Sequence, residues 1–176
     1  MMKYHFACTL IYILLVTCSA NKTIKDNIMI DGFLLNRGFQ KILLNRNSVG
    51  HFILTVFYDD NPFKVILDTG ASSTIFDIDF VRSLNVPLEQ ATFTGGGVGT
   101  SQAQVFQMPV KKIRIGTLVI RHVQPYAMSI AHINQALTER NSDKVEGVLG
   151  SDILTAYHAI IDYKNDHLYL LNQSSK

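Results

Sequence analysis

The sharpest chemical feature of the sequence is an acid, a hydroxyl and a glycine that directly follow an apolar strand. The segment reads Leu67-Asp68-Thr69-Gly70. A carboxylate at the end of a buried strand is costly unless it is hydrogen-bonded or takes part in chemistry. Gly70 lets the backbone come close, so main-chain N–H groups can face the carboxylate, and the Thr69 hydroxyl can hold the loop. Asp68 is therefore a candidate for a carboxylate that moves a proton, although the same tripeptide also occurs in ordinary turns.

Two glycine-rich patterns follow later in the chain. The first, Gly95-Gly96-Gly97-Val98-Gly99, lies in the middle of a predicted hairpin. Glycines at a hairpin tip suit a mobile lid over a site, and they also suit a plain flexible loop. The second, Gly147-Val148-Leu149-Gly150-Ser151-Asp152, places two apolar residues and a glycine before an acid that opens a predicted short helix.

The elements that must position these residues are predicted to be mostly strands. Turn residues and β-branched runs predict hairpins over residues 51–67, 92–108, 110–123 and 159–171, and a short apolar strand over 145–150. Short helices are predicted over residues 78–85, 129–141 and 151–157. Asp77 and Ser151 are the expected caps of the first and last helix, and residues 59–62 are the expected four-residue connection of the first hairpin. Many short strands with turn signals favour a barrel or a folded-over sandwich.

The three glycine-containing patterns, in this order, resemble the retropepsin-like aspartic proteases, especially their small bacterial members. The resemblance covers roughly residues 51–171. It implies a mostly β, closed barrel-like acid-protease fold with two or three short helices. It also implies that Asp68 is the catalytic aspartate and that Thr69 and Gly70 support the active site.

The resemblance extends to substrate contacts and to structural positions. It implies that substrate binds Gly70, Ala71, Ser72 and a flap tip formed by Gly96, Gly97, Val98 and Gly99. It implies that Val148-Leu149-Gly150 is threaded behind the catalytic loop and that Asp152 is structural. Retroviral members often carry an acid at the place of Ser72 and an Arg at the place of Ser151, which pair near the dimer interface. Both are Ser here, so the viral dimer geometry does not carry over, and residues 129–146, longer than the viral pattern, have no predicted role.

The chain supplies only half of the site that this chemistry requires. Amide hydrolysis needs two carboxylates that share one proton around a water molecule, and two like charges held close together do not both ionise easily. Apart from Asp68, no Asp in the chain is followed by Thr-Gly or Ser-Gly. We therefore expect a two-fold homodimer in which Asp68 of each copy faces the other, with an extended peptide or protein substrate in the cleft between the copies.

The N-terminus has the pattern of an export signal. Lys3 precedes the apolar run from Phe6 to Val16, and small residues end at Ala20. We expect residues 1–20 to be the signal peptide, 21–47 an N-terminal arm or linker, and 48–173 the protease domain, in a periplasmic or secreted protein. A retained short membrane anchor is the alternative. A lipobox-like stretch ending at Cys18 makes a lipoprotein a further alternative, although Thr17 departs from the usual pattern.

Composition excludes several other classes. Hydrophobic residues make up 47% and charged residues 17%, so the chain can fill a core. The net charge is only +2 and the longest basic run past the N-terminus is Lys111-Lys112, which argues against a nucleic-acid groove. The six His residues show no metal-ligand spacing, so we expect neither a metal nor a cofactor.

The rival functions are a non-catalytic peptide-binding module on the same fold and a structural protein of the cell envelope; the intact Asp68-Thr69-Gly70 favours an enzyme.

Overall fold

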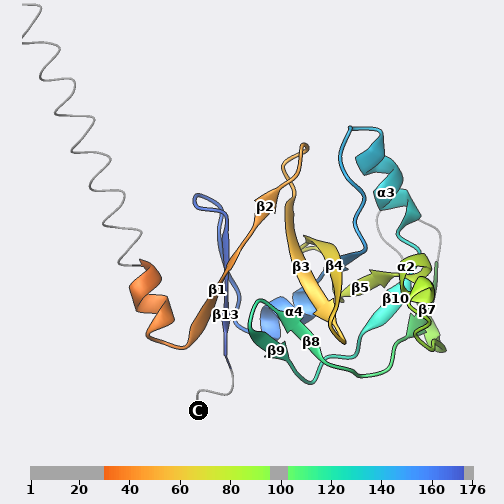
Figure 1. Cartoon of the computed structure of the whole chain (residues 1–176), viewed down its shortest axis with the longest axis horizontal. Coiled ribbons are helices and arrows are strands. Elements are labelled where there is room, and N and C mark those ends of the chain that lie inside the picture. The colour runs from red at the N-terminus through yellow and green to blue at the C-terminus, as the bar shows by residue number, and fades with distance from the viewer. Residues whose placement is uncertain (1–29, 96–102, 173–176) are drawn as a thin grey trace, which may run out of the picture. The chain divides into compact units, whose positions relative to one another are not determined.

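The computed structural model describes residues 30–95 and 103–172. The chain divides into two units, Met1–Phe39 and Gln40–Lys176. In the described part of the first unit, residues 30–35 form a helix, after which the Arg37 Cζ atom lies 4.3 Å from the centre of the Phe33 ring. The strands and helices that position the candidate site belong to the second unit (Figure 1).

Strands dominate the second unit, as the sequence predicts. In chain order they are β1 (Phe39–Leu43), β2 (Asn45–Arg46), β3 (Phe52–Tyr58), β4 (Asn61–Leu67), β5 (Ile75–Asp77), β6 (Glu89–Gly95), β7 (Ala103–Gln107), β8 (Ile113–Ile115), β9 (Leu118–Ile120), β10 (Tyr126–Met128), β11 (Gly147–Leu149), β12 (Ile160–Asp162) and β13 (His167–Leu171). The helices are α2 (Ile78–Ser83), α3 (Ala131–Thr138) and α4 (Ser151–Ala156). The predicted mostly β class with short helices is confirmed.

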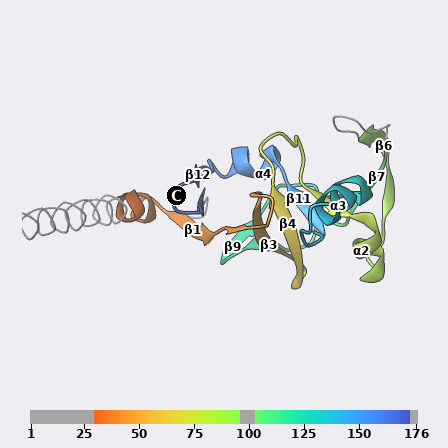
Figure 2. The same ribbon diagram turned by 90° about the horizontal axis from the view of Figure 1, so that it is seen from above.

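Two sheets organise these strands. The larger follows the order β6-β7-β10-β5-β11-β4-β3-β8-β9, with β2 added on β3, and the smaller has the order β1-β13-β12. Among the described residues the larger sheet is an open path from β6 to β9, so the barrel-like sheet is not closed into a ring. In its centre β11 runs parallel to β4 and antiparallel to β5, and Figure 2 shows β11 beside β4.

The first hairpin is tighter than predicted. Asn61 pairs with Tyr58, so the connection is the two residues Asp59 and Asp60 instead of the expected four. Their φ angles of 48° and 66° are both positive, as in the type I′ turn that matches the twist of paired strands. Pro62 stands inside β4, opposite Phe57, at a position that β11 does not reach. Its missing N–H therefore costs no bond to β11.

Part of the predicted N-terminal arm belongs to the sheets. Residues 39–46 form β1, which pairs with β13, and β2, which pairs with β3 (Figure 1). Ile42 and Leu44 are buried in the main core, and the Leu44 N–H donates to the Asp166 carbonyl at 2.8 Å. Because these apolar residues need cover and their backbone needs partners, this part of the chain is no linker.

The predicted short helices are present, and one of the two predicted caps holds its position. Asp77 is the N-cap residue of α2; its carboxylate accepts its hydrogen bond from the Ile130 N–H at 3.3 Å and keeps only weaker interactions with the backbone of Ile78 and Phe80 in its own helix. The prediction for Ser151 is wrong, because Gly150 is the N-cap of α4 and the Ser151 hydroxyl donates to the Ser72 carbonyl at 3.4 Å. Both side chains thus bond to a segment distant in sequence.

Apolar residues gather on both faces of the larger sheet. The main cluster includes Phe63, Phe76 and Leu149, which are fully buried. A smaller cluster joins Ile66 of β4 to Ile130, Leu137 and Val145. The segment 129–146, for which the sequence suggests no role, therefore covers the second face of the sheet with α3. This cover explains why Ile66 is buried although it projects away from the main core.

Candidate active site

Asp68 stands where β4 ends and is exposed to solvent. Its N–H donates to the Leu149 carbonyl at 3.0 Å, which continues the pairing of β4 with β11 by one residue. Its carboxylate oxygen Oδ1 accepts from the Gly70 N–H at 2.8 Å. The prediction that a main-chain N–H faces this carboxylate is confirmed. Within the described part of the chain, Oδ2 has no hydrogen-bond partner, so it is free to face solvent or a substrate.

Little space is left for a side chain at position 70. A Cβ atom on Gly70 would lie 3.2 Å from Asp68 Oδ1, which is tighter than an ordinary van der Waals contact. A substitution there would require the Asp68 side chain to shift by a few tenths of an ångström, and the bond from the residue-70 N–H to this carboxylate would change with it.

Ala71 and Ser72 tie the loop after Asp68 to the start of α4. The Ala71 carbonyl accepts from the Ser151 N–H at 2.8 Å, and the Ser72 carbonyl accepts from the Ser151 hydroxyl at 3.4 Å. Thr69 is exposed, and its hydroxyl makes no bond to any residue that the structure describes. Its predicted place in a hydroxyl network stays a prediction, as do the substrate contacts assigned to Gly70, Ala71 and Ser72.

Thr74 is a supporting residue that the sequence reasoning missed. It is 1% exposed, and it is the one polar residue in the buried class among those described. Its hydroxyl accepts from the Gly150 N–H at 3.0 Å and donates to Asp152 Oδ1 at 2.7 Å, while its own N–H donates to Asp152 Oδ2 at 2.8 Å. Asp152 thus has the predicted structural role. The sequence signal that could have indicated Thr74 is a hydroxyl residue directly before the apolar pair Ile75-Phe76.

The glycines of the second pattern allow β11 to pass close behind this loop. A Cβ atom on Gly150 would lie 2.5 Å from the carbonyl carbon and oxygen of Ser73, and one on Gly147 would lie 2.6 Å from the Ile75 carbonyl oxygen. Both contacts are with backbone, which cannot move aside cheaply. The predicted threading of Val148-Leu149-Gly150 behind the loop after Asp68 is confirmed.

The predicted flap is described only in its two arms. β6 and β7 pair antiparallel, with Gly95 opposite Ala103, so the hairpin is confirmed. The predicted tip residues Gly96, Gly97, Val98 and Gly99 lie outside the described residues.

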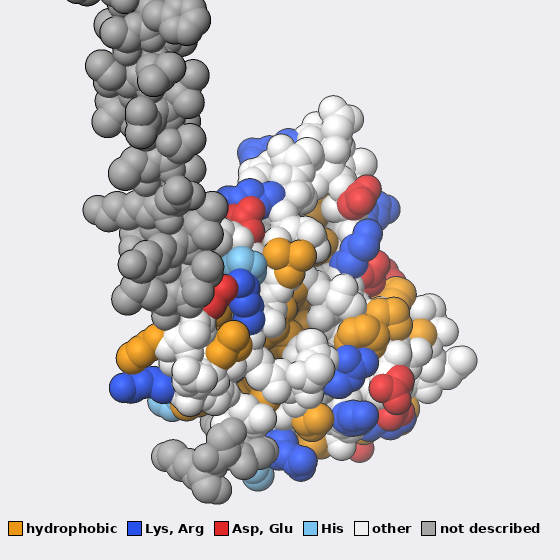
Figure 3. Space-filling view, turned by 60° about the vertical axis from the view of Figure 1, so that its left-hand side comes forward, with side chains coloured by type: hydrophobic (Ala, Val, Ile, Leu, Met, Phe, Trp, Pro, Cys, Tyr) orange, Lys and Arg blue, Asp and Glu red, His pale blue; other side chains and the backbone are white. Residues whose placement is uncertain are grey.

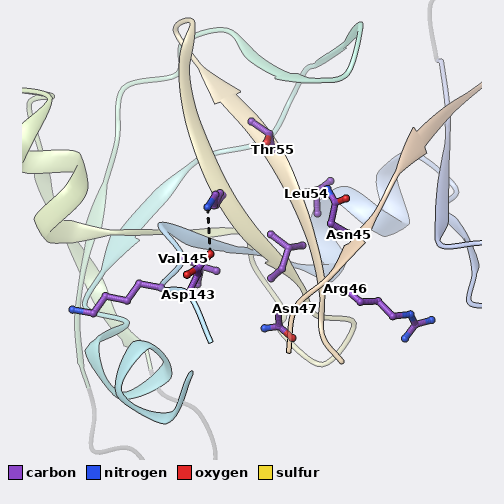
Figure 4. Close-up of a pocket in the computed structure, with 10 residues that line it drawn as sticks. Asn45, Arg46, Asn47, Leu54, Thr55, Asp143 and Val145 are labelled. Carbon is purple, nitrogen blue, oxygen red and sulfur yellow. Dashed lines mark ion pairs between the residues drawn. The ribbon is translucent and has the colours of Figure 1, made fainter. Parts of the chain in front are cut away.

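A cavity elsewhere on the domain does not include Asp68. It has a volume of about 290 Å³ and lies between β2, β3, β4 and residues 143–145 (Figure 4). Its Lys64 and Asp143 form an ion pair of 3.9 Å, and its Arg46 is held by Asp166 at 2.8 Å. The Asn47 Nδ2 atom lies buried there and has no hydrogen-bond partner among the residues that the structure describes. Since Asp68 does not line this cavity, the cavity is separate from the candidate active site.

Three further features of the described residues concern metal ligands, membrane-spanning helices and surface charge. No group of three or more His, Cys, Asp or Glu is arranged to hold a metal ion in this part of the chain. None of the helices that the structure describes has the length and apolar character needed to cross a membrane. Figure 3 shows basic and acidic side chains interspersed with apolar ones over the visible face, without a field of one sign.

Comparison with known proteins identifies the family. The family model described as "Aspartyl protease" matches residues 54–153, so the chain belongs to the aspartyl protease family. Its fold is retropepsin-like: the crystal structure of a retropepsin-like aspartic protease from Rickettsia conorii matches with a TM-score of 0.50 and 20% identity, over 75% of this chain and 90% of that one.

Two further solved structures resemble the chain more distantly. The EIAV protease, solved in complex with an inhibitor, has a TM-score of 0.48 and 23% identity, over 67% of this chain and 98% of that one. The retroviral protease-like domain of Ddi1 from Leishmania major has a TM-score of 0.47 and 14% identity, over 68% and 87%. No curated protein matches the sequence.

Proposed function

We propose that this protein is an aspartic endopeptidase that acts as a two-fold homodimer, with Asp68 of each copy forming one half of the catalytic pair. The observation that carries the proposal is the exposed Asp68 carboxylate, held by the Gly70 N–H on one oxygen and free on the other within the described chain. Membership of the aspartyl protease family supports the peptidase activity. The single Asp-Thr-Gly per chain supports the dimer, because one carboxylate cannot serve as both acid and base.

The proposed reaction uses one ionised and one protonated Asp68. The ionised carboxylate takes a proton from water as the water oxygen bonds to the peptide carbonyl carbon, and the protonated carboxyl group donates its proton to the carbonyl oxygen. The carboxyl group that received the water proton then gives it to the leaving nitrogen. As the C–N bond breaks, the other carboxylate takes back a proton from a hydroxyl of the diol, which leaves a carboxylic acid and an amine.

The substrate in this proposal is an extended peptide. Gly70, Ala71 and Ser72 lie in the loop directly after Asp68 and are proposed to contact the substrate backbone. The Gly70 N–H and both main-chain groups of Ala71 already bond within the chain, and the Ser72 carbonyl accepts from Ser151, so these contacts fall to the remaining main-chain groups. The residues proposed to close over it are Gly96, Gly97, Val98 and Gly99. An extended peptide can bind an exposed strand edge as an added strand.

The activity is tested by cleavage of a mixed peptide library. Wild-type protein, D68N and the control D79N, which changes an exposed aspartate on α2, are incubated with the library and the products are identified by mass spectrometry. We expect cleavage by wild type and D79N and none above background with D68N. Equal cleavage by D68N and wild type would refute the catalytic role.

The dimer is tested separately by sedimentation at micromolar concentration. We expect a dimer population that grows when a transition-state-like peptide inhibitor is added. A species that stays monomeric with the inhibitor bound would contradict the two-chain site.

We also propose that the protein is exported, with residues 1–20 as its signal. Intact-mass measurement of the protein from the native cell distinguishes the outcomes. A mass that starts after Ala20 supports a free mature chain, one with lipid on Cys18 supports a lipoprotein, and an unprocessed mass contradicts the proposed signal peptide.

A further inference from the structure

The cavity between β2, β3, β4 and residues 143–145 takes no part in the proposed reaction. Its volume of about 290 Å³ is close to the lower end of the range found for ligand pockets. Three cationic side chains and one acidic side chain belong to its lining, those of Arg46, Lys64, Lys144 and Asp143. Because cations outnumber acids, a ligand of this cavity is expected to be small and anionic.

Lys64 is the cation that can bind such a ligand. Arg46 already donates to Asp166 and to the Tyr163 carbonyl, each at 2.8 Å, and Figure 4 shows its side chain turned away from the cavity. Lys64 faces Asp143 at 3.9 Å, and the two side chains are 57% and 91% exposed. An ion pair this long and this exposed contributes little. The Lys64 ammonium can therefore exchange it for a closer carboxylate.

Neutral donors without partners lie around Lys64. Thr55 is directly opposite Lys64 on β3, and neither the Thr55 hydroxyl nor the Asn45 amide has a hydrogen-bond partner among the described residues. The Asn47 Oδ1 atom accepts from two backbone N–H groups of its own turn, which fixes the orientation of this amide. Its buried Nδ2 atom then has no acceptor within the described chain. A carboxylate, which only accepts hydrogen bonds, matches this set of donors.

Apolar residues complete the lining, and the walls are fixed in place. Ile53 of β3 and the buried Val145 belong to the smaller apolar cluster. The Val145 N–H donates to Asn134 Oδ1 at 2.9 Å, and the Val145 carbonyl accepts from Asn134 Nδ2 at 3.0 Å. The two walls are tied together by the Ser48 hydroxyl, which donates to the Asn141 carbonyl at 3.2 Å. Binding therefore requires little ordering of the chain.

We propose that this cavity binds a carboxylate joined to a short aliphatic group. Lys64, Thr55 and Asn45 bind the carboxylate, and Ile53 and Val145 contact the aliphatic group. Two sources offer this chemistry, a small free acid and the carboxyl terminus of a peptide whose last residue is aliphatic. The site is separate from the candidate active site, so it does not depend on the proposed peptidase activity.

The test is a titration of the full chain, followed by its backbone amide signals in nuclear magnetic resonance and carried out in a buffer without carboxylates. N-acetyl-leucine represents a peptide carboxyl terminus, isovalerate represents a small free acid, and N-acetyl-leucinamide lacks the carboxylate. We expect at least one of the two acids to shift the signals of residues 53–55, 64 and 143–145. The amide should bind about tenfold more weakly or not at all, and the tighter acid identifies the source.

The charges of the cavity predict opposite effects for two variants. K64Q should weaken the binding of the acid about tenfold, because it removes the cation. D143N should strengthen it about two- to fivefold, since it removes the competing carboxylate. V110A, at an exposed apolar residue that does not line the cavity, is the control. Circular dichroism verifies that each variant keeps its fold.

Three results would overturn the inference. Equal binding of N-acetyl-leucine and its amide, with no binding of isovalerate, would show that the carboxylate is not recognised. Unchanged binding in K64Q, or shifts confined to other residues, would place the ligand elsewhere. Absence of binding by both acids would leave water as the occupant of the cavity. None of these results bears on the proposed function, which is tested by cleavage with D68N.

Discussion

Replacing Thr74 by Val tests whether a buried hydroxyl holds the catalytic loop. Valine has the shape of threonine but neither donates nor accepts a hydrogen bond. The change removes the bond from the Gly150 N–H to the Thr74 hydroxyl and the bond from that hydroxyl to Asp152. A neutral bond contributes about 1 kcal/mol and one to a charged group about 2 kcal/mol.

The expected loss of unfolding free energy for T74V is therefore about 3 kcal/mol. For a chain of this size the loss lowers the melting temperature by about 10 °C. Peptidase activity falls as well, because the loop that carries Asp68 is less firmly attached to β11 and α4. Thermal unfolding followed by circular dichroism measures the first effect, and kcat/KM on one library peptide measures the second.

Two matched variants make the reasoning refutable. T74S keeps the hydroxyl and loses one methyl group, so we expect it to retain most of the stability. T155V makes the same substitution at an exposed position of α4 and should change little. A T74V protein that melts within about 2 °C of wild type, or a T74S protein equally destabilised, would show that the hydroxyl bonds do not hold the loop.

Two further predictions concern stability. G150A should lower the melting temperature strongly, by about 3 kcal/mol or more of unfolding free energy, because its Cβ would lie 2.5 Å from Ser73 backbone; G32A, whose Cβ meets nothing within 4 Å, is the control. Burial acts to raise the pKa of Asp162, but hydrogen bonds from Asn165 and neighbouring backbone outweigh it and hold the pKa below its ordinary value. Asp162 therefore stabilises the fold above its unfolded pKa, and this contribution disappears as pH falls through the lower folded pKa. D162N should flatten the loss of stability on acidification below about pH 4; unfolding curves between pH 6 and 2 that match those of wild type would contradict this.

Local patterns sufficed where the signal was periodic or steric. The β-branched and aromatic run 51–58, the turn residues after it and the apolar run 63–67 predicted β3 and β4, and the family resemblance implied that 148–150 is threaded behind the loop. The reason is that β-branched residues, turn residues and a missing side chain each constrain the backbone directly, whatever the partner is.

Predictions failed where a side chain had a choice of partners. Asp77 holds the predicted N-cap position, but its carboxylate accepts its hydrogen bond from Ile130. Ser151 was predicted to cap α4 and instead donates to the Ser72 carbonyl. The hydroxyl of Thr74 was missed for the same reason, because Asp152 lies 78 residues away in sequence. Hydrogen-bond partners of this kind are brought together only by the sheet.

The sequence by itself determined the family, the strand-rich fold and the single acid on which the proposed chemistry depends. Each of these follows from short runs of residues whose backbone conformation depends mainly on the residues within the run. Only the tertiary structure decided that the segment 129–146 covers the second face of the sheet, that residues 39–46 belong to the sheets, and that Thr74 meets Asp152. Those relations depend on strand order and register, which bring residues together irrespective of their distance along the chain.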